Sequence, residues 1–76
     1  MNPIPDVLVR SIPVRLGQLL QLANLIESGS AAKEVVAEGL VRVDGEVELR
    51  RGRQLHGGEG GQVDGAGSVR VVHAPQ

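Results

Sequence analysis

The stretch ESGSAAKEVVAEGLVRVDGEVELRRGRQL, residues 27–55, changes its periodicity halfway along, and this change decides the fold. Apolar residues in its first half recur at helical spacing, which predicts a helix from about Ser30 to Glu38 that Gly39 ends. Apolar and charged residues alternate in its second half, and Asp44–Gly45 is typical of a tight turn, so we expect a β-hairpin. The alternation assigns one face of the hairpin to Val41, Val43, Val47 and Leu49.

The residues before this stretch predict a short strand and another helix. Residues 1–6 contain two prolines and predict an irregular lead-in, after which Val7 to Arg10 suit a short edge strand. From Arg15 the period is helical again, and we expect this helix to end at ESG, residues 27–29, where Ser28 can cap the second helix. Its apolar face consists of Leu16, Leu19, Leu20, Ala23 and Ile26.

The residues after Leu55 are rich in glycine. The segment HGGEGGQVDGAGSVRVVHAPQ predicts a strand at Val69 to Val72 with a short partner around Gln62 to Asp64. Because glycine weakens strand packing, we expect mobile loops elsewhere in this segment. The elements together predict one α+β domain over residues 1–76, in which two helices pack on a small, mostly antiparallel β-sheet. Residues 57–76 form its glycine-rich part and contain few apolar residues.

The composition excludes several kinds of site. The chain contains no Phe, Trp, Tyr or Cys, so its core must be aliphatic, and sites that need aromatic stacking, disulfides or cysteine-bound zinc are excluded. His56 and His73 are far apart and have no metal-ligand spacing around them, so we predict neither a metal nor a cofactor. A chain of 76 residues has room for one small core.

The sequence predicts neither catalysis nor a membrane segment. No serine has a patterned histidine, and the glycine-rich run lacks the Lys-Ser/Thr ending of a phosphate-binding loop, so we expect no enzyme activity and no small-molecule substrate. The amino terminus does not resemble a signal peptide, and no apolar run approaches the roughly 20 residues of a membrane span. We therefore expect a cytoplasmic protein without a membrane partner.

A basic cluster stands out in a chain whose formal net charge is −1. Arg50, Arg51 and Arg53 fall within four positions, and a guanidinium can bind a phosphate through two parallel hydrogen bonds. The plainer interpretation is a solvated strand edge, for which Glu46 and Glu48 would supply the partners.

The segment 27–55 resembles the RNA-binding domain named after ribosomal protein S-four, also called the alpha-L motif. The matching residues are the capping Ser28, the small-then-basic pair Ala32 and Lys33, the helix-ending Gly39, the strand residues Val41 and Val43 and the turn Asp44–Gly45. With its flanks the resemblance covers about residues 14–56 and is to compact stand-alone bacterial members of the family.

The resemblance implies non-catalytic binding of structured RNA, whether ribosomal, transfer or another folded RNA. A folded RNA presents phosphates, 2′-hydroxyls and shape, so its binding needs no aromatic side chains. If about four contacts neutralise phosphates, log affinity falls with log salt at a slope of about −3, which is roughly 50- to 100-fold between 50 and 200 mM salt. The candidate RNA-binding residues are Ser28, Lys33, Arg42, Arg50, Arg51 and Arg53, with Arg15 and His56 as further candidates.

Two other functions remain open at the level of sequence. Gly29 and Asp44 stand where many members of the family have a basic residue and an asparagine, and the net charge is negative, which favours a domain that has lost RNA binding. The other alternative is a protein-interaction module that uses the arginine cluster and exposed leucines such as Leu22 or Leu25. Salt dependence separates RNA binding from a leucine-centred interface.

Overall fold

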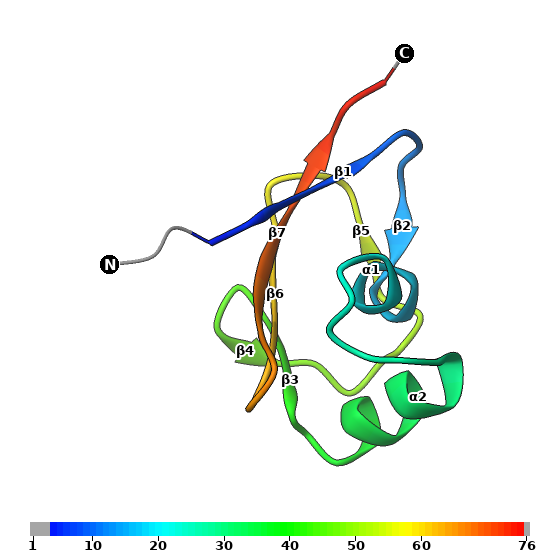
Figure 1. The fold of residues 1–76 in the computed structure, drawn as a ribbon, viewed down its shortest axis with the longest axis vertical. Coiled ribbons are helices and arrows are strands. Elements are labelled where there is room, and N and C mark those ends of the chain that lie inside the picture. Colours follow the sequence, from blue (N-terminus) through cyan, green and yellow to red (C-terminus); the bar gives the residue numbers. More distant parts are fainter. Residues whose placement is uncertain (1–3, 76) are drawn as a thin grey trace.

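A computed structural model describes residues 4–75, with two helices on one side of a five-stranded sheet (Figure 1). The strands are β1 (Asp6–Val9), β2 (Val14–Arg15), β3 (Val41–Val43), β4 (Glu46–Val47), β5 (Gln54–Leu55), β6 (Gly60–Val63) and β7 (Gly67–His73), and the helices are α1 (Leu16–Leu22) and α2 (Gly29–Ala37). The predicted α+β class is therefore confirmed.

The sheet has the strand order β1-β7-β6-β3-β4, and β2 pairs with β5 in a separate two-stranded sheet. β1 runs parallel to β7, whereas the other pairs are antiparallel, as a mostly antiparallel sheet requires. The predicted edge strand is present and begins at Asp6, one residue earlier than expected. Of the predicted irregular lead-in, residues 1–3 lie outside the described residues.

The core is aliphatic, as the composition predicted. Leu16, Leu19 and Leu20 of α1 are completely buried against the inward side chains of the sheet and Leu55 of β5. Burying a leucine or valine side chain contributes about 1.5–3 kcal/mol relative to leaving it exposed. The fully buried side chains from the other elements are Val36, Val41, Val43 and Val71.

The first helix is shorter than predicted: α1 ends at Leu22 instead of continuing to residue 27. Asn24 has a φ of +58°, a conformation that asparagine tolerates and that ends a helix. The amide of Leu25 then donates to the carbonyl of Leu20 at 3.0 Å, which closes the helix end. This turn directs Leu25 toward the core, so the expectation of an exposed Leu25 was wrong.

The second helix agrees with its sequence signals within one residue at each end. Ser28 is the N-cap, and its Oγ accepts a hydrogen bond from the amide of Ala31 at 3.1 Å. Gly39 follows the last turn with a φ of +75°, a left-handed conformation that glycine adopts more easily than other residues do. Neither of the two helices in residues 4–75 is long or apolar enough to cross a membrane.

The hairpin turn lies at Asp44–Gly45 as predicted, but the assignment of the apolar face was wrong for the second strand. Across this two-residue turn Arg42 pairs with Val47, so Val47 shares the outward face and is 48% exposed. Leu49 is 63% exposed, and Glu48 takes the inward position instead, with an exposure of 7%. With a two-residue turn, residues that pair across the hairpin have one odd and one even number, and paired residues point to the same face. The odd-numbered residues Val41 and Val43 therefore point inward on the first strand, whereas the even-numbered residues do so on the second.

The glycine-rich segment contributes two strands to the main sheet, and loops precede β6 and connect it to β7. Both strands expected in it are present, and β7 lies between β1 and β6. Gly61 is buried where a Cβ would come within 3.3 Å of Leu19 Cδ2, so glycine lets α1 pack closely on β6. The carboxylate of Glu59 accepts hydrogen bonds from the amides of His56 (2.8 Å) and Gly57 (2.7 Å), which fixes the loop before β6.

Asp44 stabilises the connection between the hairpin and β6. Its Oδ1 accepts a hydrogen bond from the amide of Gly60 at 2.8 Å, and its φ is +51°. We expect Asp44→Ala to lower the free energy of unfolding by about 1–2 kcal/mol, because it loses this bond and strains the backbone. Asp44→Asn keeps a hydrogen-bond acceptor, and the control Asp64→Ala removes an exposed carboxylate. The free energy of unfolding of both variants, measured in urea, should therefore stay within about 0.5 kcal/mol of the wild-type value. Equal losses for Asp44→Ala and Asp64→Ala would contradict this role.

Candidate nucleic-acid interface

A groove of about 470 Å³ lies where α1, the start of α2 and the loop between β4 and β5 meet. The two charged residues that line it are both arginines, one at the start of α1 and one from the loop. We call it the basic groove, and its lining residues are Arg15, Gly17, Gln18, Gln21, Gly29, Ala32, Arg51 and Gly52.

The first turn of α1 holds the arginine loop by its backbone. The amide of Leu16 donates to the carbonyl of Arg53 at 2.8 Å, and the amide of Gly17 donates to the carbonyl of Arg51 at 3.0 Å. The first amides of a helix have no partner within the helix, so these carbonyls satisfy them. The docked loop brings Arg51 to the same groove that Arg15, the N-cap of α1, also lines.

The start of α2 also lines the groove. Gly29 and Ala32 line it, and within residues 4–75 the amides of Gly29 and Ser30 have no acceptor. The unpaired amides give this helix end a partial positive charge. Lys33 is exposed and follows Gly29 by four residues, so it lies on the same face of the helix.

Two of the three clustered arginines are paired with the buried carboxylate of Glu48. Arg50 Nε lies 3.1 Å from Glu48 Oε2, and Arg53 Nη1 lies 3.1 Å from Glu48 Oε1. The Arg50 side chain makes a second hydrogen bond at 3.2 Å, and its backbone amide donates to Oε2 at 3.0 Å. Hydrogen bonds from the Arg50 side chain lower the pKa of Glu48 most, and despite the opposing effect of burial this pKa is about 2.

This pairing changes how the cluster presents its charge. Glu48 offsets one of the three positive charges, and Arg53 keeps only 33% of its side chain exposed. Arg50 is 76% exposed beside the same carboxylate. Arg51 is therefore the arginine of the cluster that reaches the basic groove.

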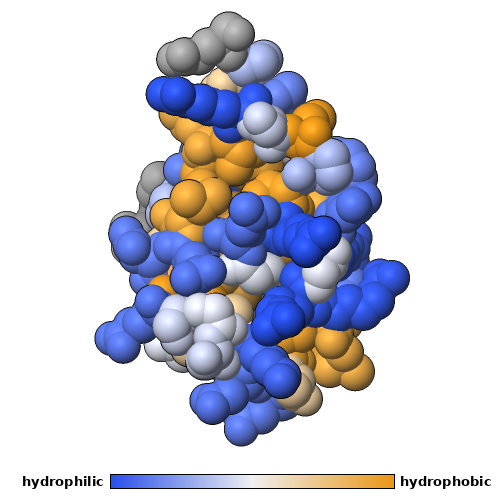
Figure 2. All heavy atoms as spheres, turned by 90° about the vertical axis from the view of Figure 1, so that its right-hand side faces the viewer, coloured by the Kyte–Doolittle hydropathy of each residue, from blue (hydrophilic) through white to orange (hydrophobic). Residues whose placement is uncertain are grey.

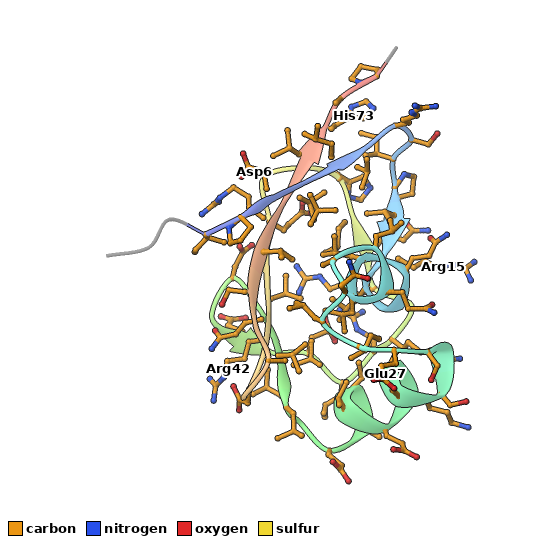
Figure 3. The ribbon with its side chains drawn as sticks, in the orientation of Figure 1. Asp6, Arg15, Glu27, Arg42 and His73 are labelled. Atoms are coloured by element: carbon orange, nitrogen blue, oxygen red, sulfur yellow. The ribbon has the colours of Figure 1, made fainter. Side chains whose placement is uncertain are left out.

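Arg42 and His56 lie apart from the groove. Arg42 and Arg15 are on opposite sides of the molecule in Figure 3, and Arg42 Nη1 donates to the carbonyl of Gly45 at 3.4 Å. His56 is exposed after β5 and does not line the groove. Asp44 belongs to the same turn as Gly45, so its charge lies near Arg42 rather than on the groove.

Of the predicted residues, Arg51 and the further candidate Arg15 line the basic groove. Ser28 and Lys33 belong to the start of α2, whose Gly29 and Ala32 also line it. Sequence reasoning did not select Gln18 and Gln21, although both lie on the polar face of the predicted first helix. On this side of the molecule hydrophilic side chains run across the middle and apolar ones gather above them (Figure 2). Within residues 4–75 no group of three His, Asp or Glu side chains could hold a metal ion.

Comparison with known families and proteins finds relatives over most of the chain. The family model of the S4 domain matches residues 7–72. The probable ribosome maturation protein RlbA of Bacillus subtilis is 43% identical over 60 residues, which is 79% of this chain and 84% of that protein. A tyrosine–tRNA ligase of Burkholderia lata is 36% identical over 58 residues, but these are only 14% of the enzyme.

The fold is also that of a solved structure. The protein YbcJ of Escherichia coli is 47% identical over 60 residues, which is 78% of this chain and 83% of YbcJ. Its solution structure superposes with a TM-score of 0.70 and 38% identity, over 95% of this chain and 91% of YbcJ. YbcJ is described as containing an alpha-L motif involved in RNA binding.

Proposed function

The chain belongs to the S4 domain family, and on that premise we propose that it binds folded RNA in the basic groove without catalysing a reaction. The observation that carries this proposal is the meeting of Arg15 and Arg51, from two separate segments, beside the start of α2. The RNA-binding role described for the alpha-L motif of YbcJ supports it.

The groove offers the contacts that a folded RNA backbone needs. The guanidinium groups of Arg15 and Arg51 can each bind a phosphate, and the free amides of Gly29 and Ser30 can donate hydrogen bonds to another. Gln18 has donor and acceptor atoms suited to a 2′-hydroxyl. Binding of this kind recognises the backbone and shape of the RNA more than its sequence.

The comparisons favour one class among folded RNAs. RlbA is named as a probable ribosome maturation protein, which supports ribosomal RNA as the partner of this chain. The match to tyrosine–tRNA ligase covers too little of that enzyme to carry over its activity. In this proposal residues 7–72 act as one binding unit, and an RNA partner is consistent with the predicted cytoplasmic location.

A salt titration tests the proposal directly. With about three phosphate contacts, from Arg15, Arg51 and Lys33, log affinity should fall with log salt at a slope between about −2 and −3. The affinity for a labelled RNA hairpin should then fall about 20- to 40-fold between 50 and 200 mM salt. Fluorescence anisotropy measures both values, and the matching DNA duplex serves as the control for shape. No binding at 50 mM salt would overturn the proposal.

A second hollow makes protein contact the second candidate function. Leu8 and Leu22, which are 67% and 59% exposed, line a hollow of about 400 Å³ together with Pro13 and Val14. Exposed apolar side chains that gather in one place are typical of protein interaction sites. Binding centred on this hollow would depend weakly on salt and would be lost in Leu22→Glu, whereas RNA binding in the basic groove would persist in that variant.

A further inference from the structure

The side chain of Arg51 lies directly on the first turn of α1, at Gly17. Gly17 is buried beneath it, and a Cβ built at Gly17 would lie 2.8 Å from Arg51 Cγ and 3.4 Å from Arg51 Cδ. The first distance is shorter than carbon atoms tolerate, so any side chain at this position must displace the aliphatic part of Arg51. Cγ is close to the backbone, so movement of the guanidinium group alone would not relieve the contact.

The backbone contact between the same two residues does not need glycine. The added Cβ would lie 3.7 Å from the carbonyl oxygen of Arg51, which is an ordinary contact distance. The hydrogen bond from the Gly17 amide to that carbonyl can therefore form with alanine at position 17. Glycine within a helix is less stable than alanine, so a buried helical glycine calls for a reason in its surroundings.

We propose that Gly17 is a positioning residue, which lets the aliphatic part of Arg51 pack on α1 and so holds its guanidinium group at the basic groove. This inference rests on the proposed RNA binding and specifies how the groove is preorganised. An arginine held in its binding position loses less conformational freedom when a phosphate arrives. Arg15, the other charged residue of the lining, has no such contact with a glycine in residues 4–75.

A double-mutant cycle between Gly17→Ala and Arg51→Ala tests the proposal. We expect Gly17→Ala to lower the affinity for an RNA hairpin about 5- to 10-fold at 50 mM salt, because the Arg51 side chain is displaced. Its salt slope should move toward that of Arg51→Ala, as one phosphate contact is weakened. In the Arg51→Ala background Cγ is absent, so Gly17→Ala should leave affinity unchanged and raise Tm, since alanine favours the helix.

The Tm values of the four proteins in the cycle distinguish a positioning role of Gly17 from a general structural role. A purely structural glycine would lower Tm on substitution in both backgrounds and would leave the salt slope unchanged. If Gly17→Ala alone does not fold, a folded double variant that binds like Arg51→Ala supports the proposal.

Two outcomes would overturn the inference, and they differ in what else they affect. In the first outcome, the wild-type protein binds RNA with the expected salt slope, but Gly17→Ala either keeps the wild-type affinity or lowers affinity equally in the wild-type and Arg51→Ala backgrounds. The positioning role is then wrong and the proposed function stands. If the wild-type protein shows no salt-dependent binding, both the proposed function and the positioning role fall.

Discussion

Reversal of both groove arginines, in the variant Arg15→Glu with Arg51→Glu, should lower the affinity for an RNA hairpin by about 100-fold or more at 50 mM salt. Each charge-assisted hydrogen bond to a phosphate contributes about 1.5–3 kcal/mol, and two such bonds are lost. The reversed charges then repel the RNA backbone. The salt slope should become shallower by about 1.5, since about two phosphates are no longer neutralised. Fluorescence anisotropy over a range of salt concentrations measures both effects.

The matched control makes the same change in net charge away from the groove. Arg42 and Arg70 do not line the groove, and Arg42 lies on the opposite side of the molecule from Arg15 in Figure 3. We expect Arg42→Glu with Arg70→Glu to lower affinity less than about 5-fold, because screening limits the reach of exposed charges to about 10 Å at 0.1 M salt. Equal losses from the two double variants would place the interface elsewhere.

Removal of the Glu48 carboxylate should cause the largest loss of stability. Glu48→Ala leaves Arg50 and Arg53 without their acceptor and removes a buried group that makes four hydrogen bonds. We expect the free energy of unfolding to fall by about 2–3 kcal/mol and Tm to fall by about 10–20 °C. The control Glu46→Ala removes an exposed carboxylate two residues earlier and should stay within about 0.5 kcal/mol. Urea unfolding followed by circular dichroism measures the difference, and equal effects would contradict the role of the buried ion pair.

The same carboxylate predicts how stability depends on pH. The pKa of Glu48 is about 2 in the folded protein against an ordinary value of 4.5, so between these values the unfolded chain binds more protons. Its stabilising contribution is therefore complete above the ordinary pKa and is lost as pH falls toward 2. Arg50 is 76% exposed, so solvent screening reduces this contribution.

The variant and the wild type should differ in their response to acid. Glu48→Ala should lose less stability than the wild type between pH 6 and pH 3. Some acid sensitivity should remain, because the pKa of Glu59 is also lowered. Burial raises this pKa, but the hydrogen bonds from the amides of His56 and Gly57 outweigh that effect. An identical acid response in wild type and variant would show that Glu48 is not the source.

The features that sequence reasoning predicted correctly are set by a few neighbouring residues. Ser28 caps α2 through the amide three residues later, and Gly39 ends the helix, so both signals act within one turn of chain. Two local signals were present in the sequence but were not used. Asn24 marked the early end of α1, and the two-residue turn at Asp44–Gly45 implied the inward position of Glu48.

The sequence alone determined the α+β class, the aliphatic core, both helix starts and the hairpin turn, because each depends on local periodicity, capping or composition. The tertiary structure alone decided which arginine reaches the groove. Glu48 pairs with Arg50 and Arg53, and the loop carbonyls bind the first turn of α1, more than thirty residues earlier in the chain. Spacing in a sequence does not encode such contacts, because they exist only when distant segments pack together.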